Sequence, residues 1–108
     1  MSRPYSIDYL LTAQQDLQDI VDYMARDNPS AAPAFVDRID RAIGRLALHP
    51  TSGRGPAGVP GTTGMRRRGY RMLVVGDDLA FYVVTGRTVQ IRRVFHGARR
   101  YEFLLTDR

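Results

Sequence analysis

Three apolar segments, separated by two tight turns, fill most of the second half of the chain and constrain its fold more than any other feature. Alternating, β-branched residues between such turns predict strands, and strands joined by tight turns pair as an antiparallel meander. The nearly unbroken apolar character of the second segment predicts the central strand. The predicted strands are Met65 to Val75, Leu79 to Val84 and Thr88 to His96, and the turns are Gly76-Asp77-Asp78 and Thr85-Gly86-Arg87.

The third predicted strand runs directly into a cluster of cationic and titratable residues. Side chains alternate between the two faces of a strand. This alternation predicts two opposed sets, which are Val89, Ile91 and Arg93 on one face and Gln90, Arg92 and Val94 on the other. Beyond them the chain continues as Phe95-His96-Gly97-Ala98-Arg99-Arg100. Because a strand end holds side chains more rigidly than a free loop does, we expect this rim to bind an anion or a protein partner.

A short strand and an amphipathic helix are predicted before residue 28. The segment from Tyr5 to Leu10 alternates as a strand does, and Thr12 is a suitable helix N-cap with Gln15 as its capping-box partner. The apolar stripe of this helix has helical spacing and consists of Leu17, Ile20, Val21 and Met24. Outside the stripe, a solvated face rather than a metal site is expected for Asp16, Asp19 and Asp22.

A second amphipathic helix is predicted from about Ala31 to Leu48. Its cap is either Ser30, or Asn28 with Pro29 in the first helical position, and the sequence leaves both open. The residues expected to be buried are Phe35, Ile39, Ala42, Ile43 and Leu46. A short link between two such helices makes them antiparallel neighbours, and a sheet is the apolar surface that their stripes need.

The predicted order is therefore β-α-α-β-β-β, an α+β fold in which a helical hairpin packs on a small twisted antiparallel sheet. The 108 residues are expected to form one domain, which buries roughly 65% of the surface of the unfolded chain. A long loop is expected from Thr51 to Gly64, because this segment holds five glycines and two prolines. The segment from Tyr101 to Leu105 is apolar enough to pack back on the domain.

Composition excludes several kinds of chemistry. The chain has no cysteine, which excludes disulfides, a thiolate nucleophile and a cysteine-based metal site. It has no lysine, which excludes lysine-based catalysis, and Glu102 is the only glutamate. We expect no cofactor and no bound metal. No apolar run is long enough to span a membrane, and residues 1–5 do not resemble an export signal, so a cytoplasmic protein is expected.

Charge is distributed unevenly along the chain. The net charge is +5, and all sixteen basic residues are arginine. Residues 1–50 hold five arginines and seven aspartates, whereas residues 51–108 hold eleven arginines and four acids. The use of arginine alone fits either the codon bias of a GC-rich genome or the recognition of phosphates and carboxylates. The basic second half is compatible with a nucleic acid or an acidic protein as partner.

Taken in order, four segments resemble the RelE/ParE superfamily of bacterial toxins from toxin–antitoxin pairs, and the resemblance covers roughly residues 5 to 105. These segments lie in the first helix, in the link between the helices, at the end of the second helix, and in the strands with their C-terminal motif. The segments are Thr12 to Ile20, Asp27 to Ala32, Ile39 to Pro50, and Val75-Gly76 with Phe81-Tyr82 and Ile91 to Arg99. The ending Val-Phe-His-Gly-Ala-Arg is more similar to the ParE branch.

The ParE-like resemblance implies a toxin that inhibits DNA gyrase by protein contact, blocks replication and has no catalytic residues of its own. It also implies a cognate antitoxin, ParD-like or of another family, in a hetero-oligomeric complex. An amphipathic segment of that antitoxin is expected near the helical hairpin and the sheet edge. The candidate partner-binding residues are Arg66, Arg68, Arg93, His96, Arg99 and Arg100.

Two alternatives follow from the same resemblance. A RelE-like or YoeB-like toxin cleaves mRNA on the ribosome, and its catalytic residues here would be His96, Arg93, Arg99 and Tyr101. That set lacks a lysine, and Asp78 stands where the nucleases often have a basic residue. A degenerate toxin that only binds its antitoxin is the other alternative.

For two of these features, a purely structural role is as compatible with the sequence as a functional one. His96 is either catalytic or a hydrogen-bonded residue that ends a strand. The run Arg66-Arg67-Arg68 either binds nucleic acid or forms a solvated strand edge.

Overall fold

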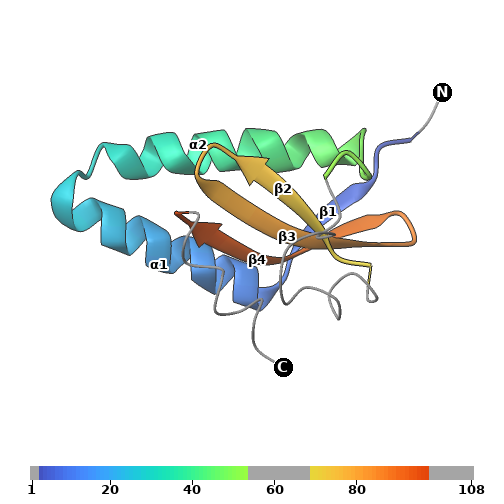
Figure 1. Ribbon diagram of the computed structural model, residues 1–108, viewed down its shortest axis with the longest axis horizontal. Helices are drawn as coiled ribbons and strands as arrows, with labels where there is room; N and C mark the ends of the chain where they lie inside the picture. The colour runs from blue at the N-terminus through green and yellow to red at the C-terminus, as the bar shows by residue number, and fades with distance from the viewer. Residues whose placement is uncertain (1–2, 54–68, 98–108) are drawn as a thin grey trace.

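The computed structural model describes residues 3–53 and 69–97, which form two helices, a short 3-10 helix and one sheet (Figure 1). In chain order, the elements are β1 (Ser6–Tyr9), α1 (Leu11–Asp27), α2 (Ala31–Gly44), η1 (Arg45–Ala47), β2 (Arg71–Val75), β3 (Asp78–Thr85) and β4 (Thr88–His96). The predicted order β-α-α-β-β-β is confirmed. The predicted long loop and C-terminal segment lie largely outside the described residues.

The sheet has four strands in the order β1-β4-β3-β2. The meander of β2, β3 and β4 is antiparallel as predicted, and β3 is internal to the sheet. The prediction of a wholly antiparallel sheet is wrong, because β1 pairs with β4 in parallel, from Ser6 opposite Thr88 to Tyr9 opposite Ile91. A parallel partner needs a long crossover, and the helical hairpin and the meander together supply it.

Both hairpin turns consist of two residues, the first of which is a glycine. Gly76 and Gly86 have φ angles of 61° and 60°. A positive φ at the first central position is what a type II′ turn requires, and glycine adopts it without steric cost. These turns explain why the strand boundaries of β3 and β4 could be predicted closely.

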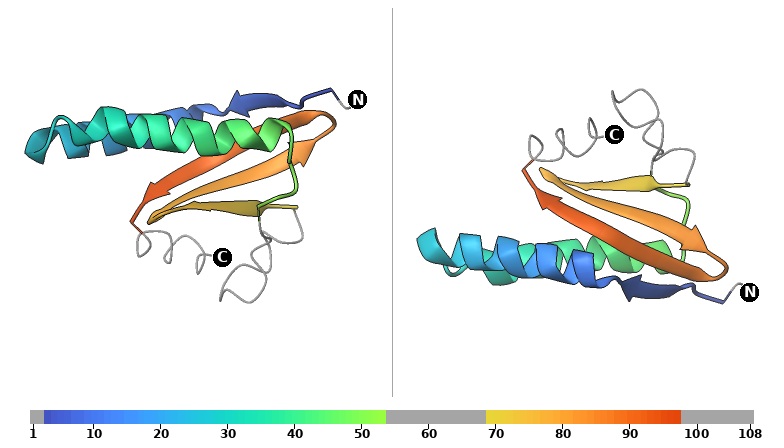
Figure 2. Two further views of the ribbon diagram at one scale, coloured as in Figure 1. Left: turned by 90° about the horizontal axis from the view of Figure 1, so that it is seen from above. Right: turned by 90° about the horizontal axis from the view of Figure 1, so that it is seen from below.

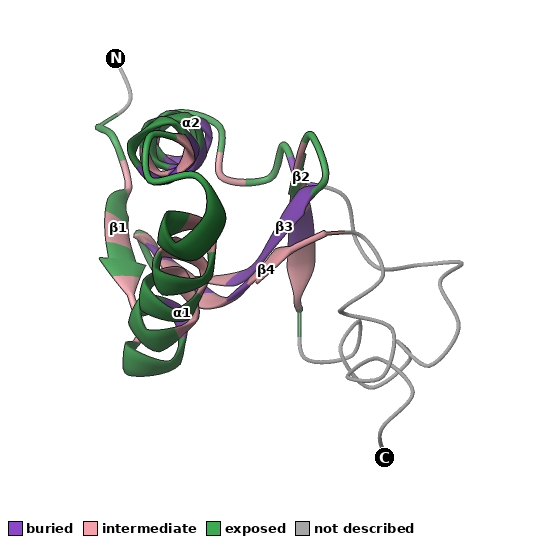
Figure 3. Cartoon of the chain, turned by 90° about the vertical axis from the view of Figure 1, so that its left-hand side faces the viewer, coloured by how far each residue is buried: buried purple, intermediate pink, exposed green. Residues whose placement is uncertain are grey.

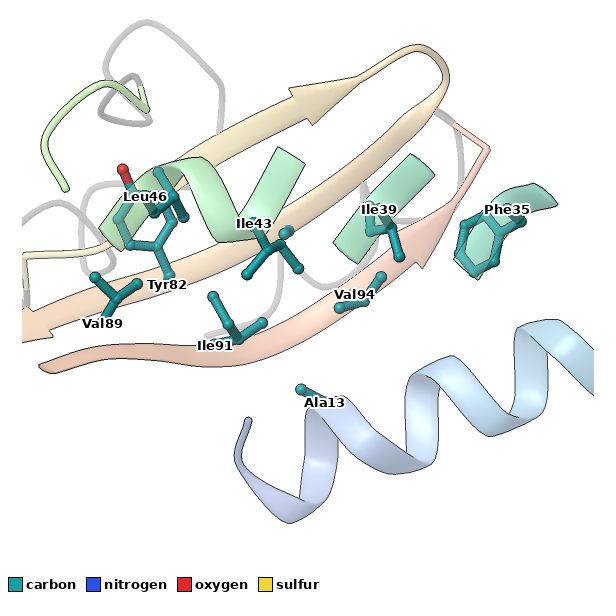
Figure 4. Packing of buried hydrophobic residues seen from close by; sticks show 10 residues of the cluster. Ala13, Phe35, Ile39, Ile43, Leu46, Tyr82, Val89, Ile91 and Val94 are labelled. Carbon is teal, nitrogen blue, oxygen red and sulfur yellow. The ribbon is translucent and has the colours of Figure 1, made fainter. Parts of the chain in front are cut away.

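The helical hairpin covers one face of the sheet (Figure 2). The side chains of the second predicted helix that were expected to be buried are all buried. The helix ends at Gly44 and not at Leu48 as predicted, so the last of these residues, Leu46, belongs to η1. Figure 4 shows Ile39, Ile43 and Leu46 over β4 and Tyr82. The stripe on α1 is only partly buried, and Ala13 is the α1 residue that lies fully in the core. Figure 3 shows the same difference, since most of α1 is exposed. The core residues are Ala13, Phe35, Ile39, Ile43, Leu46, Ala80, Tyr82, Val89, Ile91 and Val94.

A β-bulge in β4 changes the predicted faces of that strand. Tyr82 lies opposite Ile91, while the preceding Phe81 lies opposite Arg93, so Arg92 is the extra residue. The extra residue resets the alternation. Val94 therefore joins Ile91 in the core, with 1% of its surface exposed, and the prediction that it faces the other way is wrong.

The predicted helix caps are not formed. α1 begins at Leu11 without a side-chain cap, and Gln15 donates to Asp19 Oδ1 at 2.8 Å. Ser30 precedes α2, but its hydroxyl donates to Asn28 Oδ1 at 2.8 Å instead of capping the helix. The Thr12 hydroxyl does not cap α1 and donates to the backbone of β4, at Arg92 O.

The chain after η1 is held on the sheet by Tyr82. The Tyr82 hydroxyl donates to Pro50 O at 2.8 Å and accepts from Gly53 N–H at 2.9 Å. A Cβ on Gly53 would lie 2.5 Å from that hydroxyl oxygen, so only glycine allows this approach. Burial is the main cause of the raised pKa of Tyr82.

Candidate functional site

Helix α1 closes the edge of β4 where β1 ends. Leu10 N–H donates to Ile91 O at 3.0 Å, which continues the pairing of β1 with β4 by one residue. Beyond this point, the Thr12 hydroxyl donates to Arg92 O at 2.7 Å, and Val94 N–H donates to Asp16 Oδ2 at 2.9 Å. Side chains of α1 thus satisfy backbone groups that an open strand edge would leave unpaired.

Arg93 is bound by Asp16 through both carboxylate oxygens. Arg93 Nε donates to Asp16 Oδ2 at 2.8 Å and Nη2 donates to Oδ1 at 3.0 Å. The hydrogen bonds from Asp16 raise the pKa of Arg93, against the lowering effect of burial. Only 14% of the Asp16 side chain is exposed, so the prediction that Asp16 lies on a solvated face is wrong. A bidentate pair of this kind neutralises Arg93 and fixes the orientation of its guanidinium group.

His96 is held by a buried carboxylate. His96 Nδ1 lies 2.6 Å from Asp78 Oδ1, and Arg38 Nη2 lies 3.2 Å from Asp78 Oδ2. The side chain of Asp78 is 1% exposed, and Phe35 packs edge-on against the His96 ring at 5.7 Å. Asp78 was predicted in a turn, but it is the first residue of β3 and lies directly opposite His96. This geometry fits the interpretation of His96 as a hydrogen-bonded residue at a strand end.

A cleft of about 590 Å³ lies between α1 and the end of β4. Both described residues of the predicted basic rim, Arg93 and His96, line it. Three aspartates line it as well, and two of them accept hydrogen bonds from neighbouring glutamines of α1. The described wall is therefore mixed in charge. The lining residues are Asp16, Asp19, Ile20, Asp22, Tyr23, Arg26, Arg93, Val94, Phe95 and His96.

The structure brings together only two of the predicted site residues. The others lie outside the described residues and are Arg66, Arg68, Arg99, Arg100 and Tyr101. Sequence reasoning missed Arg38 and underrated Asp16 and Asp78, the partners that hold His96 and Arg93. One signal was available for Asp78, because an acid that opens an otherwise apolar strand is unusual.

The described residues show neither a metal-ligand cluster nor a membrane-spanning helix. Within residues 3–53 and 69–97, no three histidine, aspartate or glutamate side chains gather as metal ligands would. Neither of the two described α-helices has the length and apolar character needed to cross a membrane.

A family model and a related protein both identify the chain as similar to bacterial toxins. Residues 7–101 match the family model of the ParE toxin of the type II toxin–antitoxin system parDE. The protein Y4kP of Sinorhizobium fredii, which is named as a toxin, is 33% identical over 102 residues, covering 92% of this chain and 95% of that protein.

Solved structures agree with this family. The chromosomal ParDE toxin–antitoxin system from P. aeruginosa contains a chain that is 26% identical, with a TM-score of 0.69 over 89% of this chain and 99% of that one. The toxin–antitoxin complex RelBE2 from Mycobacterium tuberculosis shares the fold, with 24% identity and a TM-score of 0.59 over 91% of this chain and 97% of that one. The chain described here belongs to the ParE toxin family of type II toxin–antitoxin systems.

Proposed function

We propose that this chain acts in the cytoplasm as a ParE-like toxin that inhibits DNA gyrase by protein contact and blocks replication. The observation that carries the proposal is the bidentate pair of Arg93 and Asp16. RNA cleavage needs a cation that is free to stabilise the charge on the reacting phosphate. Because Asp16 already neutralises Arg93, a toxin that acts by contact is favoured over one that cleaves RNA.

The cleft beside β4 is the proposed antitoxin-binding surface. The P. aeruginosa relative belongs to a ParDE system and the M. tuberculosis neighbour is a toxin–antitoxin complex, which supports an antitoxin partner here. Ile20, Tyr23 and Phe95 offer apolar contacts, and Arg26 and His96 offer polar ones. An amphipathic antitoxin segment fits this mixture. Deleting that segment from the antitoxin is expected to abolish neutralisation, whereas full neutralisation by the truncated antitoxin would exclude this surface.

One observation favours the endoribonuclease as the second candidate. A carboxylate that binds His96 at Nδ1 fixes the orientation of the imidazole and leaves Nε2 for proton transfer. His96 is partly exposed and lines the cleft, so an RNA hydroxyl could reach it. Activity of this kind would depend on His96 and not on His49, which is exposed elsewhere.

The test uses purified protein and DNA gyrase with relaxed and supercoiled plasmid, with and without ATP. Loss of supercoiling together with trapped linear DNA is expected. If gyrase is unaffected, mRNA cleavage on ribosomes is measured with His96→Ala and with His49→Ala as the matched control. Cleavage lost only in His96→Ala would establish the nuclease, and no effect in either assay would favour a chain that only binds its antitoxin.

A further inference from the structure

A second hollow lies between β1, α1 and α2 and shares no described lining residue with the cleft beside β4. It is a groove of about 560 Å³. Figure 3 shows β1, α1 and α2 on the side of the molecule away from β2. We call it the hairpin groove, and its lining residues are Asp8, Tyr9, Gln14, Leu17, Gln18, Val21, Val36 and Asp40.

The floor of the hairpin groove is aliphatic. Leu17 and Val21 come from one face of α1, and Val36 comes from α2. These side chains are only half-buried, although they also pack against the core. The predicted core stripe of α1 is thus shared between the protein interior and the groove. Partly exposed aliphatic side chains in a hollow are suited to receive an apolar side chain of a partner.

The charged residues that line the hairpin groove are acidic. Asp8 and Asp40 belong to its lining, which contains no arginine, lysine or histidine among the described residues. Tyr9 adds no positive charge, because its hydroxyl donates to Asp40 Oδ1 at 2.9 Å. Burial, followed by the hydrogen bond and the charge of Asp40, raises the pKa of Tyr9 and keeps the phenol neutral. The two carboxylates therefore give the groove a negative potential that its own lining does not compensate.

We propose that the hairpin groove binds a segment of DNA gyrase in which an apolar side chain is followed closely by arginine or lysine. This inference rests on the proposed function. A lining that combines aliphatic side chains with two carboxylates complements such a segment in polarity and charge. DNA is a poor occupant because phosphates are repelled by Asp8 and Asp40.

The first test reverses the charge of the groove. The double variant Asp8→Arg/Asp40→Arg is compared with Asp27→Arg/Asp37→Arg, which makes the same change at exposed helix positions outside both hollows. Tyr9→Phe controls for the lost bond to Asp40, and thermal melting confirms that each variant folds. The groove variant is expected to need roughly tenfold more protein for half-inhibition of supercoiling, with the helix control within about twofold of wild type.

The second test uses the absence of cysteine from the chain. A photoactivatable maleimide on Gln18→Cys places a single cross-linker in the groove, and Asp27→Cys is the matched control. Cross-linking to a purified gyrase subunit is expected from position 18 and not from position 27.

The outcomes separate the inference from the proposed function. If the wild-type chain inhibits gyrase and the groove variant inhibits equally well, the inference is overturned and the function stands. Equal cross-linking from positions 18 and 27 would also overturn the inference. A wild-type chain that leaves gyrase active overturns the proposed function and this inference together.

Discussion

The cleft beside β4 and the hairpin groove are both lined with aspartates, but they use these charges differently. In the cleft, Asp16 binds Arg93 and a backbone N–H, and the wall residue His96 is bound by the buried Asp78. In the groove, Asp8 has no hydrogen-bond or ion-pair partner within the part of the chain that the structure describes. Charges of the first kind stabilise the fold, whereas charges of the second kind are available to a partner.

The largest effect is expected at the buried carboxylate of Asp78. Asp78→Ala leaves His96 and Arg38 without their shared acceptor, and unfolding free energy should fall by about 3 kcal/mol. Asp77→Ala, one residue earlier and exposed in the turn, is the matched control and should change stability by less than about 0.5 kcal/mol. Urea unfolding measures both. Equal losses in the two variants would show that Asp78 does not support the cleft.

A smaller loss is expected at the edge closed by α1. Asp16→Ala removes both hydrogen bonds to Arg93 and leaves Val94 N–H without its acceptor, which should cost about 2 kcal/mol. Asp19→Ala, one turn later on α1, loses only an exposed bond to Gln15 and should be nearly neutral. Hydrogen exchange at Val94 should speed up in the first variant alone. Unchanged exchange there would refute the edge closure.

The groove predicts a loss of stability at alkaline pH. The folded-state pKa of Tyr9 lies above its ordinary value of 10.0, so its contribution to stability is complete below about pH 10 and is lost as pH rises above it. Without lysine or cysteine, tyrosine is the main side chain that titrates in this range. Tyr9→Phe should reduce the decline between about pH 9.5 and 11 by roughly 1 kcal/mol, with Tyr5→Phe as control. An unaltered decline in Tyr9→Phe would contradict the prediction.

The smallest effect on stability is expected at Asp8. Asp8→Ala removes an exposed charge without a described partner, so unfolding free energy should change by less than about 0.5 kcal/mol. Gyrase inhibition should nevertheless weaken. A clear loss of stability in this variant would mean that the groove charges support the fold as the cleft charges do, and the contrast between the two hollows would disappear.

Local signals in the sequence predicted most of the elements. The apolar stripe of the second helix, the positions of the two glycine turns and the apolar run of β3 each depend on residues that are close in sequence. Each was predicted to within one or two residues, and Asp78, predicted in the first turn, instead begins β3. Register and contacts between distant segments were not predicted. The bulge at Arg92 leaves the apolar pattern of β4 looking regular, and a period-two reading therefore assigned Val94 to the wrong face.

The candidate site was less predictable than the fold because it depends on contacts between residues that are distant in sequence. Arg93 and His96 were identified from the strand end, but the residues that decide their chemistry lie elsewhere. Asp16 is 77 residues from Arg93 in sequence, and Asp78 is 18 residues from His96. Nothing in the spacing of Asp16, Asp19 and Asp22 marks the first of them as the one that β4 binds.

The parallel pairing of β1 with β4 also imposes an order on the synthesis of the protein. Ser6 leaves the ribosome early, but its partner Thr88 is made only after both helices and two further strands. A nascent chain that stops before Thr88 can form the helical hairpin, whose contacts are local, but has no strand on which β1 or Asp16 can dock. Truncated translation products of this toxin should therefore lack a closed sheet edge and be early substrates for proteolysis.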